Sequence, residues 1–380
     1  MSCTFNGKRL REARYYNSLS ITQLADKLSI SKQMVSKYEN GQSSPSLENL
    51  FKIMKTLGFP KEFFYYDYGV SLQNGGTFYR SLLTSTQKQK APSNVLMEAA
   101  SIYRDFLDSY VEFPHEDNID LSSYSSEVAA QKLRDYWNLG DKPIQNMINL
   151  MESHGLTIIF LPDKMEKVDA FGSYRMVRDN EYYIVAVRKN TSFFKEQFSL
   201  AHELAHKVLH ASVWNPADLD NYEYRLMEKQ ANEFAAAFLL PMNSFIESVK
   251  NINFLDEIFE KKKQWFVSGS AIIQRMKQLS LITEKDYIKY QKQISYKRYR
   301  KTEPYDNDLN YPVQCPTLLN QATKLIVDND LMRPYQISDK IQEMYKVKYP
   351  GKLLEEITLL PHNYFDFVER SALININLKR

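Results

Sequence analysis

The sequence predicts a mainly α-helical protein with a small α+β domain in its middle. Glycine is scarce, with 11 among 380 residues, which favours helices over hairpins with tight turns. Two short apolar stretches, LTIIFLP at 156–162 and EYYIVAVR at 181–188, have the length and composition of buried strands. The segment between them, 163–180, is long and polar and is expected to be a loop. A chain of 380 residues exceeds one average core and indicates two or three domains.

The overall composition is that of a soluble globular protein, with 43% hydrophobic and 25% charged residues. The net charge of +3 is too small to indicate or exclude a nucleic-acid partner. The two cysteines, Cys3 and Cys315, lie far apart without metal-ligand spacing, which fits a reducing compartment. No apolar run approaches the length of a membrane span. We therefore expect a cytoplasmic protein without a membrane partner.

Changes in composition and periodicity divide the chain into four predicted segments. A Gly75-Gly76 break and a polar run separate the first helices from the rest. The predicted segments are an N-terminal domain at 1–68, a helical connector at 69–125, the α+β domain at 126–250 and a C-terminal helical module at 251–380.

The N-terminal segment is predicted to be a five-helix bundle. Its second helix, ITQLADKL, follows Ser20 and its third, KQMVSKYE, follows Ser31; both serines are good helix caps. Two short helices joined by a tight turn fit the major groove of DNA. The segment carries ten Lys and Arg against six Asp and Glu. Arg9, Arg11 and Lys27 are expected to be solvated or to contact the DNA backbone. A bundle that binds only protein stays open as the alternative.

The stretch ITQLADKLSISKQMVSKYENGQSSPSLENLFKI resembles the Cro-type (XRE) repressor domain, a helix-turn-helix fold that binds double-stranded operator DNA. The resemblance implies that the third helix lies in the groove, with Lys32, Gln33 and Lys37 facing bases and with Ser31 and Ser36 contacting phosphates. Glutamine can pair bidentately with adenine, and lysine can donate to guanine. Repressors of this type often bind two-fold sites as dimers, so a homodimer is expected.

A histidine pair stands on a predicted helix of the α+β domain, in FSLAHELAHKVLH at 198–210. His202 and His206 are four residues apart and project from one helix face, among apolar neighbours. Buried imidazoles need partners, and zinc would satisfy both if a third ligand were present. Glu228 lies in line with the apolar stripe of the next predicted helix, which completes a His₂Glu ligand set with Glu203 as general base. An amphipathic helix with incidental histidines is the alternative.

Three further residues are candidates for supporting roles. Asn232 lies one turn after Glu228 and is placed to orient a metal ligand through a hydrogen bond. Tyr174 and His210 are the candidate hydrogen-bond donors to an oxyanion, and the sequence does not choose between them. His210 follows the pair at HExxHxxxH spacing, which favours a histidine near the site over a metal ligand.

The segment FKEQFSLAHELAHKVLH, followed by EKQANEFAAAFLLP, is similar to the ImmA/IrrE family of zinc-dependent endopeptidases. The resemblance implies a zincin-like, gluzincin-type minimal protease core. It also implies His202, His206 and Glu228 as ligands of Zn²⁺, and Glu203 as the catalytic acid and base. With the repressor-like front, the resemblance covers nearly all of the chain.

The C-terminal third is predicted to be helical and holds no constellation of catalytic residues. Its basic, tyrosine-rich run YIKYQKQISYKRYRK fits a solvated helix face better than a nucleic-acid contact. We expect a module that senses a signal or binds a partner. For the whole chain we expect a transcriptional regulator that cleaves a protein, a repressor or an antitoxin, in stress, phage or mobile-element control. The alternative is a non-proteolytic transcription factor or antitoxin whose HExxH site is structural, regulatory or inactive.

Overall fold

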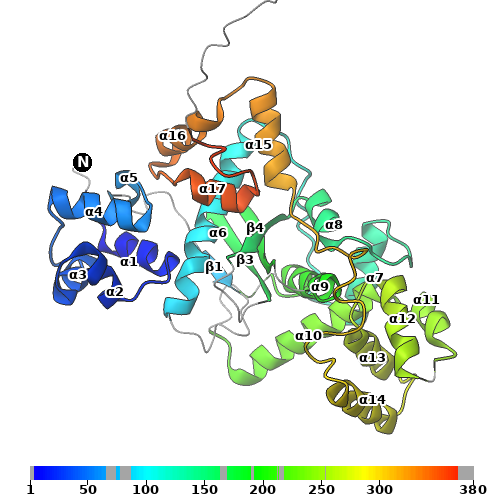
Figure 1. The fold of residues 1–380 in the computed structure, drawn as a ribbon. Coiled ribbons are helices and arrows are strands. Elements are labelled where there is room, and N and C mark those ends of the chain that lie inside the picture. Colours follow the sequence, from blue (N-terminus) through cyan, green and yellow to red (C-terminus); the bar gives the residue numbers. More distant parts are fainter. Residues whose placement is uncertain are drawn as a thin grey trace, which may run out of the picture.

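The computed structural model describes most of the chain, and all structural statements below concern the described residues: 4–65, 74–77, 87–162, 169–189, 192–211, 213, 218–252 and 254–366. It is mainly helical around one small sheet (Figure 1), as the sequence predicts. None of the described helices combines the length and apolar character that crossing a membrane requires.

The N-terminal residues form the expected five-helix bundle. Side chains at the helix starts accept amide hydrogens two or three residues ahead, as Ser20 does from Gln23 and Ser31 from Met34. Between these two helices Ser29 takes the left-handed conformation (φ 56°), which makes the turn tight. The helices are α1 (Gly7–Tyr16), α2 (Ile21–Leu28), α3 (Lys32–Glu39), α4 (Leu47–Leu57) and α5 (Lys61–Tyr65).

A mixed four-stranded sheet lies in the middle of the molecule. The two predicted strands are present, joined by two more, and the spatial order is β1-β3-β4-β2. β3 and β4 form an antiparallel hairpin, β2 is parallel to β4, and β1 is antiparallel to β3. The strands are β1 (Asn74–Thr77), β2 (Thr157–Leu161), β3 (Ala170–Val177) and β4 (Asn180–Arg188).

The third strand corrects the expectation of one long polar loop between the two predicted strands. The segment AFGSYRMV is polar enough to resemble a loop, yet it pairs with β4 along its whole length. The tight turn that allows this pairing has Arg178 at φ 56°. Pairing satisfies the backbone hydrogen bonds of the segment, and that gain does not depend on an apolar sequence.

Alternate residues of the sheet face two different buried clusters. Ile159 and Ile184 belong to a cluster with α6 (Gln87–Asp108), whereas Ile158 and Val185 belong to a cluster with α9 (Phe193–Leu209). α6 and α9 therefore cover opposite faces of the sheet, as the two-residue period of a strand requires.

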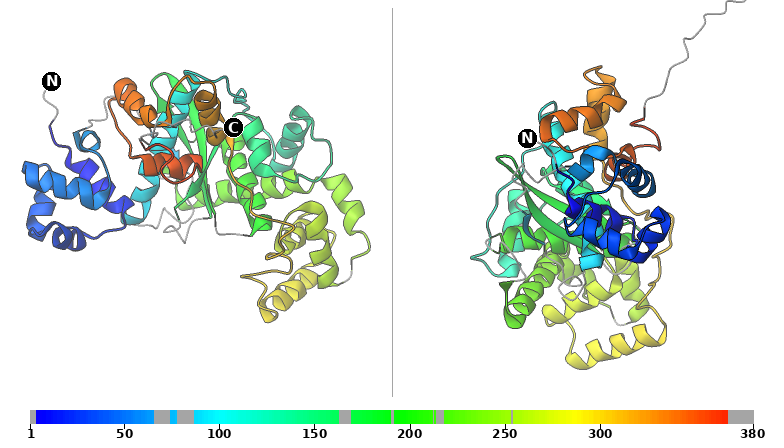
Figure 2. Two further views of the ribbon diagram at one scale, coloured as in Figure 1. Left: turned by 45° about the horizontal axis from the view of Figure 1, so that its top comes forward. Right: turned by 90° about the vertical axis from the view of Figure 1, so that its left-hand side faces the viewer.

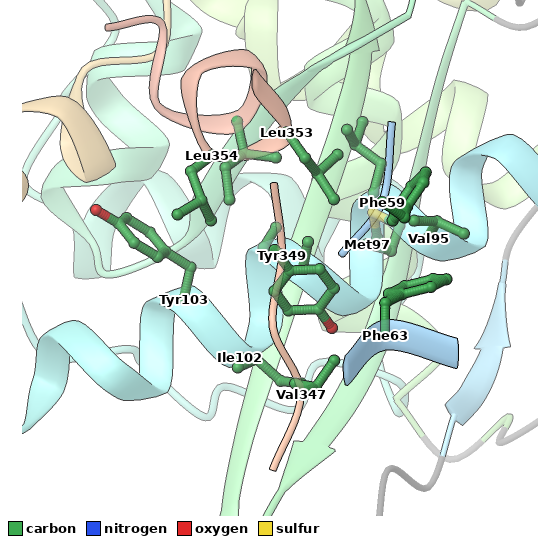
Figure 3. Packing of buried hydrophobic residues seen from close by; sticks show 14 of the residues in the cluster. Phe59, Phe63, Val95, Met97, Ile102, Tyr103, Val347, Tyr349, Leu353 and Leu354 are labelled. Carbon is green, nitrogen blue, oxygen red and sulfur yellow. The ribbon is translucent and has the colours of Figure 1, made fainter. Parts of the chain in front are cut away.

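The two buried clusters do not follow the order of the sequence. The first joins the N-terminal bundle, α6 and the last three helices, and Figure 3 shows Tyr349, Leu353 and Leu354 facing Tyr103 of α6 and Phe63 of the bundle. The last three helices are α15 (Leu318–Asp328), α16 (Pro334–Tyr345) and α17 (Gly351–Thr358).

The second cluster continues well past residue 250. Its helices are α7 (Ser126–Tyr136), α8 (Met147–Ser153), α9, α10 (Asn221–Leu239), α11 (Met242–Val249), α12 (Leu255–Trp265), α13 (Gly269–Gln278) and α14 (Glu284–Tyr296). In Figure 1 and the left view of Figure 2, α12 to α14 lie at the end of the molecule away from the N-terminal bundle. The segment 251–380 thus contributes to both clusters, and the three boundaries drawn from the sequence stay a proposal.

The expectation of a solvated Arg9 is wrong. Its side chain is fully buried and its guanidinium pairs with Glu98 of α6, with Nη1 to Oε2 at 2.9 Å. Arg11, by contrast, is partly exposed and donates to Asn40. The sequence around Arg9 is polar, so only the packing of α6 on α1 could reveal its burial.

Candidate metal site and candidate DNA-binding helix

Two helices carry the predicted metal ligands. α9 is capped by Ser192, whose side chain accepts from the Lys195 amide, and α10 is capped by Asp220, which forms reciprocal hydrogen bonds with Glu223. The apolar residues of both helices share the second buried cluster, so the helices pack face to face. His202, Glu203 and His206 of α9 are thereby brought beside Glu228 of α10, a residue twenty-two positions after His206 in the sequence.

The three predicted ligands converge in space. The Nε2 atoms of His202 and His206 are 3.1 Å apart, and each lies 3.6 Å from an oxygen of Glu228. One ligand atom from each of the three residues lies within 4.8 Å of the others. Two ligands bound at zinc distances in a tetrahedral site are separated by roughly 3.3 to 3.4 Å, so the donor set and the spacing fit such an ion.

Burial determines the electrostatics of the cluster. Glu228 is 7% exposed and His206 only 1%. Burial lowers the pKa of His202 to about 3 and lowers the pKa of His206 well below its ordinary value. Both imidazoles are therefore neutral near pH 7, which is the form that a metal ion requires of a histidine ligand.

Two polar side chains of α10 support the ligands. The Asn232 amide donates to the Glu228 carbonyl at 2.7 Å, and the side chain also hydrogen-bonds to His202. The Tyr224 hydroxyl donates to Oε1 of Glu228 at 2.9 Å. Tyr224 was missed from the sequence, although its position one helical turn before Glu228 was a usable signal.

Glu203 points from α9 toward the sheet. Its Oε2 accepts the amide hydrogen of Gly172 in β3 at 2.6 Å, and the Tyr183 hydroxyl donates to its backbone carbonyl at 3.1 Å. Burial is the main cause that raises the pKa of the carboxyl well above its ordinary value, and the charge of Glu228 acts in the same direction. The sheet therefore fixes the carboxyl group next to the ligand cluster.

The two candidate oxyanion donors lie in different surroundings. The Tyr174 hydroxyl donates to the backbone carbonyl of Lys207 at 3.1 Å, so it must leave this partner before it can serve a substrate. The His210 ring lies behind His206, with the two Nδ1 atoms 3.1 Å apart. His210 is not among the residues whose ligand atoms converge.

A cavity of about 500 Å³ opens beside the ligand cluster. Glu228 and Asn232 form part of its wall, together with the aromatic ring of Phe198 from α9 and Gln274 and Gln278 from α13. The charged side chains of Arg225, Lys229 and Glu233 also line it. The cavity thus combines one aromatic surface with charged groups and with amide groups that can bond to a peptide backbone.

The face of α3 predicted to bind DNA is available to a partner. Lys32, Gln33 and Lys37 are exposed, while Val35 and Tyr38 of the same helix are buried in the bundle. Of the two predicted phosphate contacts, Ser31 is exposed and caps α3, whereas Ser36 is half-buried and accepts from Asn40 at 3.4 Å.

The fold and the two sites define a two-part protein: an N-terminal helix-turn-helix bundle and a domain that carries a cluster of potential metal ligands. Comparison with family models assigns both parts. Residues 9–64 match a model described as helix-turn-helix, and residues 151–277 match a peptidase-family model described as the IrrE N-terminal-like domain. The chain therefore joins an XRE-type helix-turn-helix domain to an IrrE-like peptidase domain, which confirms both resemblances. A search among curated proteins finds no significant match.

Proposed function

We propose that the protein is a DNA-binding transcriptional regulator whose zinc-dependent endopeptidase domain cleaves a repressor or an antitoxin. The observation that carries the proposal is the convergence of His202, His206 and Glu228 next to the fixed carboxyl group of Glu203. An exposed α3 on the same chain supplies the means to bind an operator.

The three converging residues would hold the zinc ion. When bound, such an ion polarises a carbonyl group and makes water a better nucleophile near neutral pH. Tyr224 and Asn232 keep Glu228 and His202 in place through their hydrogen bonds.

Glu203 is the residue we assign to proton transfer. Its carboxylate takes the proton of the attacking water and passes it to the amine that leaves the cleaved peptide bond. The Gly172 amide holds one carboxyl oxygen and leaves the other for this exchange.

The cavity beside the cluster is the proposed binding site for the substrate. Its amide groups, Gln274 and Gln278, suit the backbone of an extended segment, and Phe198 suits an apolar side chain. An extended segment is accessible in a flexible region of a protein, which fits a repressor or an antitoxin as substrate.

The peptidase proposal is tested by mapping new protein amino termini in cells that carry wild type or Glu203→Gln, with and without DNA damage or phage stress. We expect a terminus inside a repressor or an antitoxin that disappears in Glu203→Gln while zinc content stays unchanged. Glu247→Gln, at an exposed position of α11, is the matched control and should keep the terminus. If no terminus depends on Glu203, the non-proteolytic regulator with a structural or inactive metal site is the better interpretation.

The DNA-binding proposal needs a separate test. Replacing Lys32, Gln33 and Lys37 by alanine should remove specific operator binding and reduce the salt dependence of the remaining affinity, because two cations are lost. Alanine at Lys142 and Lys250, two exposed cations outside α3 and outside the basic run at 287–301, removes the same charge and should leave operator affinity unchanged. Equal losses in both variants would mean that α3 is not the recognition helix. A homodimer would require two half-sites about one helical turn apart.

A further inference from the structure

One imidazole nitrogen of His206 faces away from the metal ligands. Its Nε2 lies 3.1 Å from Nε2 of His202, and its Nδ1 lies 3.1 Å from Nδ1 of His210. The second ring nitrogen of His210, Nε2, is 3.2 Å from Oε1 of Gln230. Both histidines are buried, with exposures of 1% and 6%. The three side chains form a continuous hydrogen-bond chain, His206–His210–Gln230.

The end of this chain determines where each proton lies. Oε1 of Gln230 only accepts, so Nε2 of His210 must carry the hydrogen. A neutral imidazole with its hydrogen on Nε2 has a lone pair on Nδ1, which can accept from His206. His206 then carries its hydrogen on Nδ1 and presents a lone pair from Nε2 toward His202 and Glu228.

The opposite arrangement is unfavourable at each step. A hydrogen on Nδ1 of His210 would leave Nε2 of the same ring without a proton to donate to Gln230. It would also force His206 to accept on Nδ1 and to carry its own hydrogen on Nε2, the atom that faces the other ligands. A nitrogen that carries a hydrogen cannot bind a metal ion.

We propose that His210 and Gln230 are positioning residues that fix the tautomer and the ring orientation of His206 for metal binding. The inference rests on the proposed metal site and assigns His210 neither to the ligands nor to the oxyanion. In known metal sites, a histidine ligand usually donates the N–H of its other ring nitrogen to a second residue. Here that residue is an imidazole, which can perform the task in one tautomer only, and Gln230 selects that tautomer.

The backbone of both helices supports the arrangement. His210 ends α9, and its amide donates to the His206 carbonyl at 3.1 Å, so the two rings are held one helical turn apart. Gln230 stands on α10, two residues after Glu228. The hydrogen-bond chain therefore also connects the helix that carries two ligands to the helix that carries the third.

The first test measures the tautomers directly in the metal-free, full-length protein. Histidine labelled with ¹⁵N gives separate NMR signals for protonated and unprotonated ring nitrogens, and the chain has only six histidines. We expect the hydrogen of His210 on Nε2 and that of His206 on Nδ1. A hydrogen on Nδ1 of His210 would overturn the proposal, whether or not any variant folds.

The second test measures zinc affinity by competition with a chelating dye. His210→Ala should weaken binding by about 10- to 100-fold, the usual effect of losing such a supporting residue. His210→Asn should retain most of the affinity, because its side-chain oxygen can accept from His206. His362→Ala is the matched control, since the His362 side chain is 80% exposed and lies outside α9 and α10.

The outcomes separate the two proposals. Wild-type affinity in His210→Ala would refute the positioning role while leaving the metal site intact. Failure of the wild-type protein to bind zinc would refute the proposed metal site, and the tautomer measurement would still decide the hydrogen-bond chain. Gln230→Ala should weaken zinc binding less than His210→Ala does. If Gln230→Ala binds zinc as tightly as wild type, Gln230 does not select the tautomer.

Discussion

Replacing Glu98 by glutamine removes the negative charge that faces the buried guanidinium of Arg9. The two side chains join α6 to α1 through two hydrogen bonds, and the Tyr349 hydroxyl donates to the same carboxylate. Arg9 also lies over the ring of Phe63, 4.5 Å from its centre, so no water replaces the lost partner. Burial alone would lower the pKa of Arg9, and the charge of Glu98 raises it. An arginine side chain does not lose its proton in proteins, so the guanidinium stays charged in Glu98→Gln.

The expected cost follows from a buried charge that loses its buried partner and keeps the partly exposed Glu12. Removing one partner of a buried ion pair lowers the free energy of unfolding by about 3 to 5 kcal/mol. Glutamine keeps one acceptor oxygen, so we expect the lower end, about 3 kcal/mol. Replacing both Arg9 and Glu98 by methionine leaves no buried charge and should cost clearly less than Glu98→Gln.

Hydrogen exchange is the suitable assay, because a chain with two buried clusters need not unfold in one step. Faster exchange is expected in peptides from α1 and α6, with peptides from α12 to α14 unchanged. Glu12→Gln, which removes the partly exposed second partner of Arg9, is the matched control and should have a small effect. The reasoning would be refuted if Glu98→Gln lowered the free energy of unfolding by less than about 1 kcal/mol. It would also be refuted if the loss in the double methionine variant equalled the sum of the losses in its two single variants.

Three further predictions concern single residues. Burial raises the pKa of Glu196 to about 8, so the folded protein holds a proton that the unfolded chain releases near 4.5; stability measured by urea unfolding should fall as pH rises through this window, by up to about 1.4 kcal/mol per pH unit, and Glu196→Gln should flatten the fall. Gly172→Ala places a methyl group 2.1 Å from the Tyr183 hydroxyl, so either β3 or the buried Tyr183 ring must shift; a loss of about 1 to 3 kcal/mol is expected in thermal unfolding. Lys262→Met removes the cation that pairs with the buried carboxylates of Glu303 and Asp306. The free energy of unfolding should fall by about 3 to 5 kcal/mol in the same assay, and an unchanged melting temperature would contradict this prediction.

The chain by itself determined those features that depend on neighbours within one or two helical turns. Helix starts at Ser20 and Ser31 follow from local capping, and they lie where the sequence predicts. His202 and His206 share a face because four residues make about one turn of any α-helix. Glu228 lies on another helix, yet it could be predicted as a ligand from the pattern of its own helix, because a carboxylate within an apolar stripe requires a partner.

Only the tertiary structure decided which distant groups meet. The burial of Arg9, the strand at 170–177 and the division of the C-terminal helices between two clusters all depend on contacts between segments far apart in sequence. Gln230 carries no sequence signal, since its role exists only where α10 brings it to His210. The physical reason is that periodicity shows which face of an element is buried, but not which partner covers it.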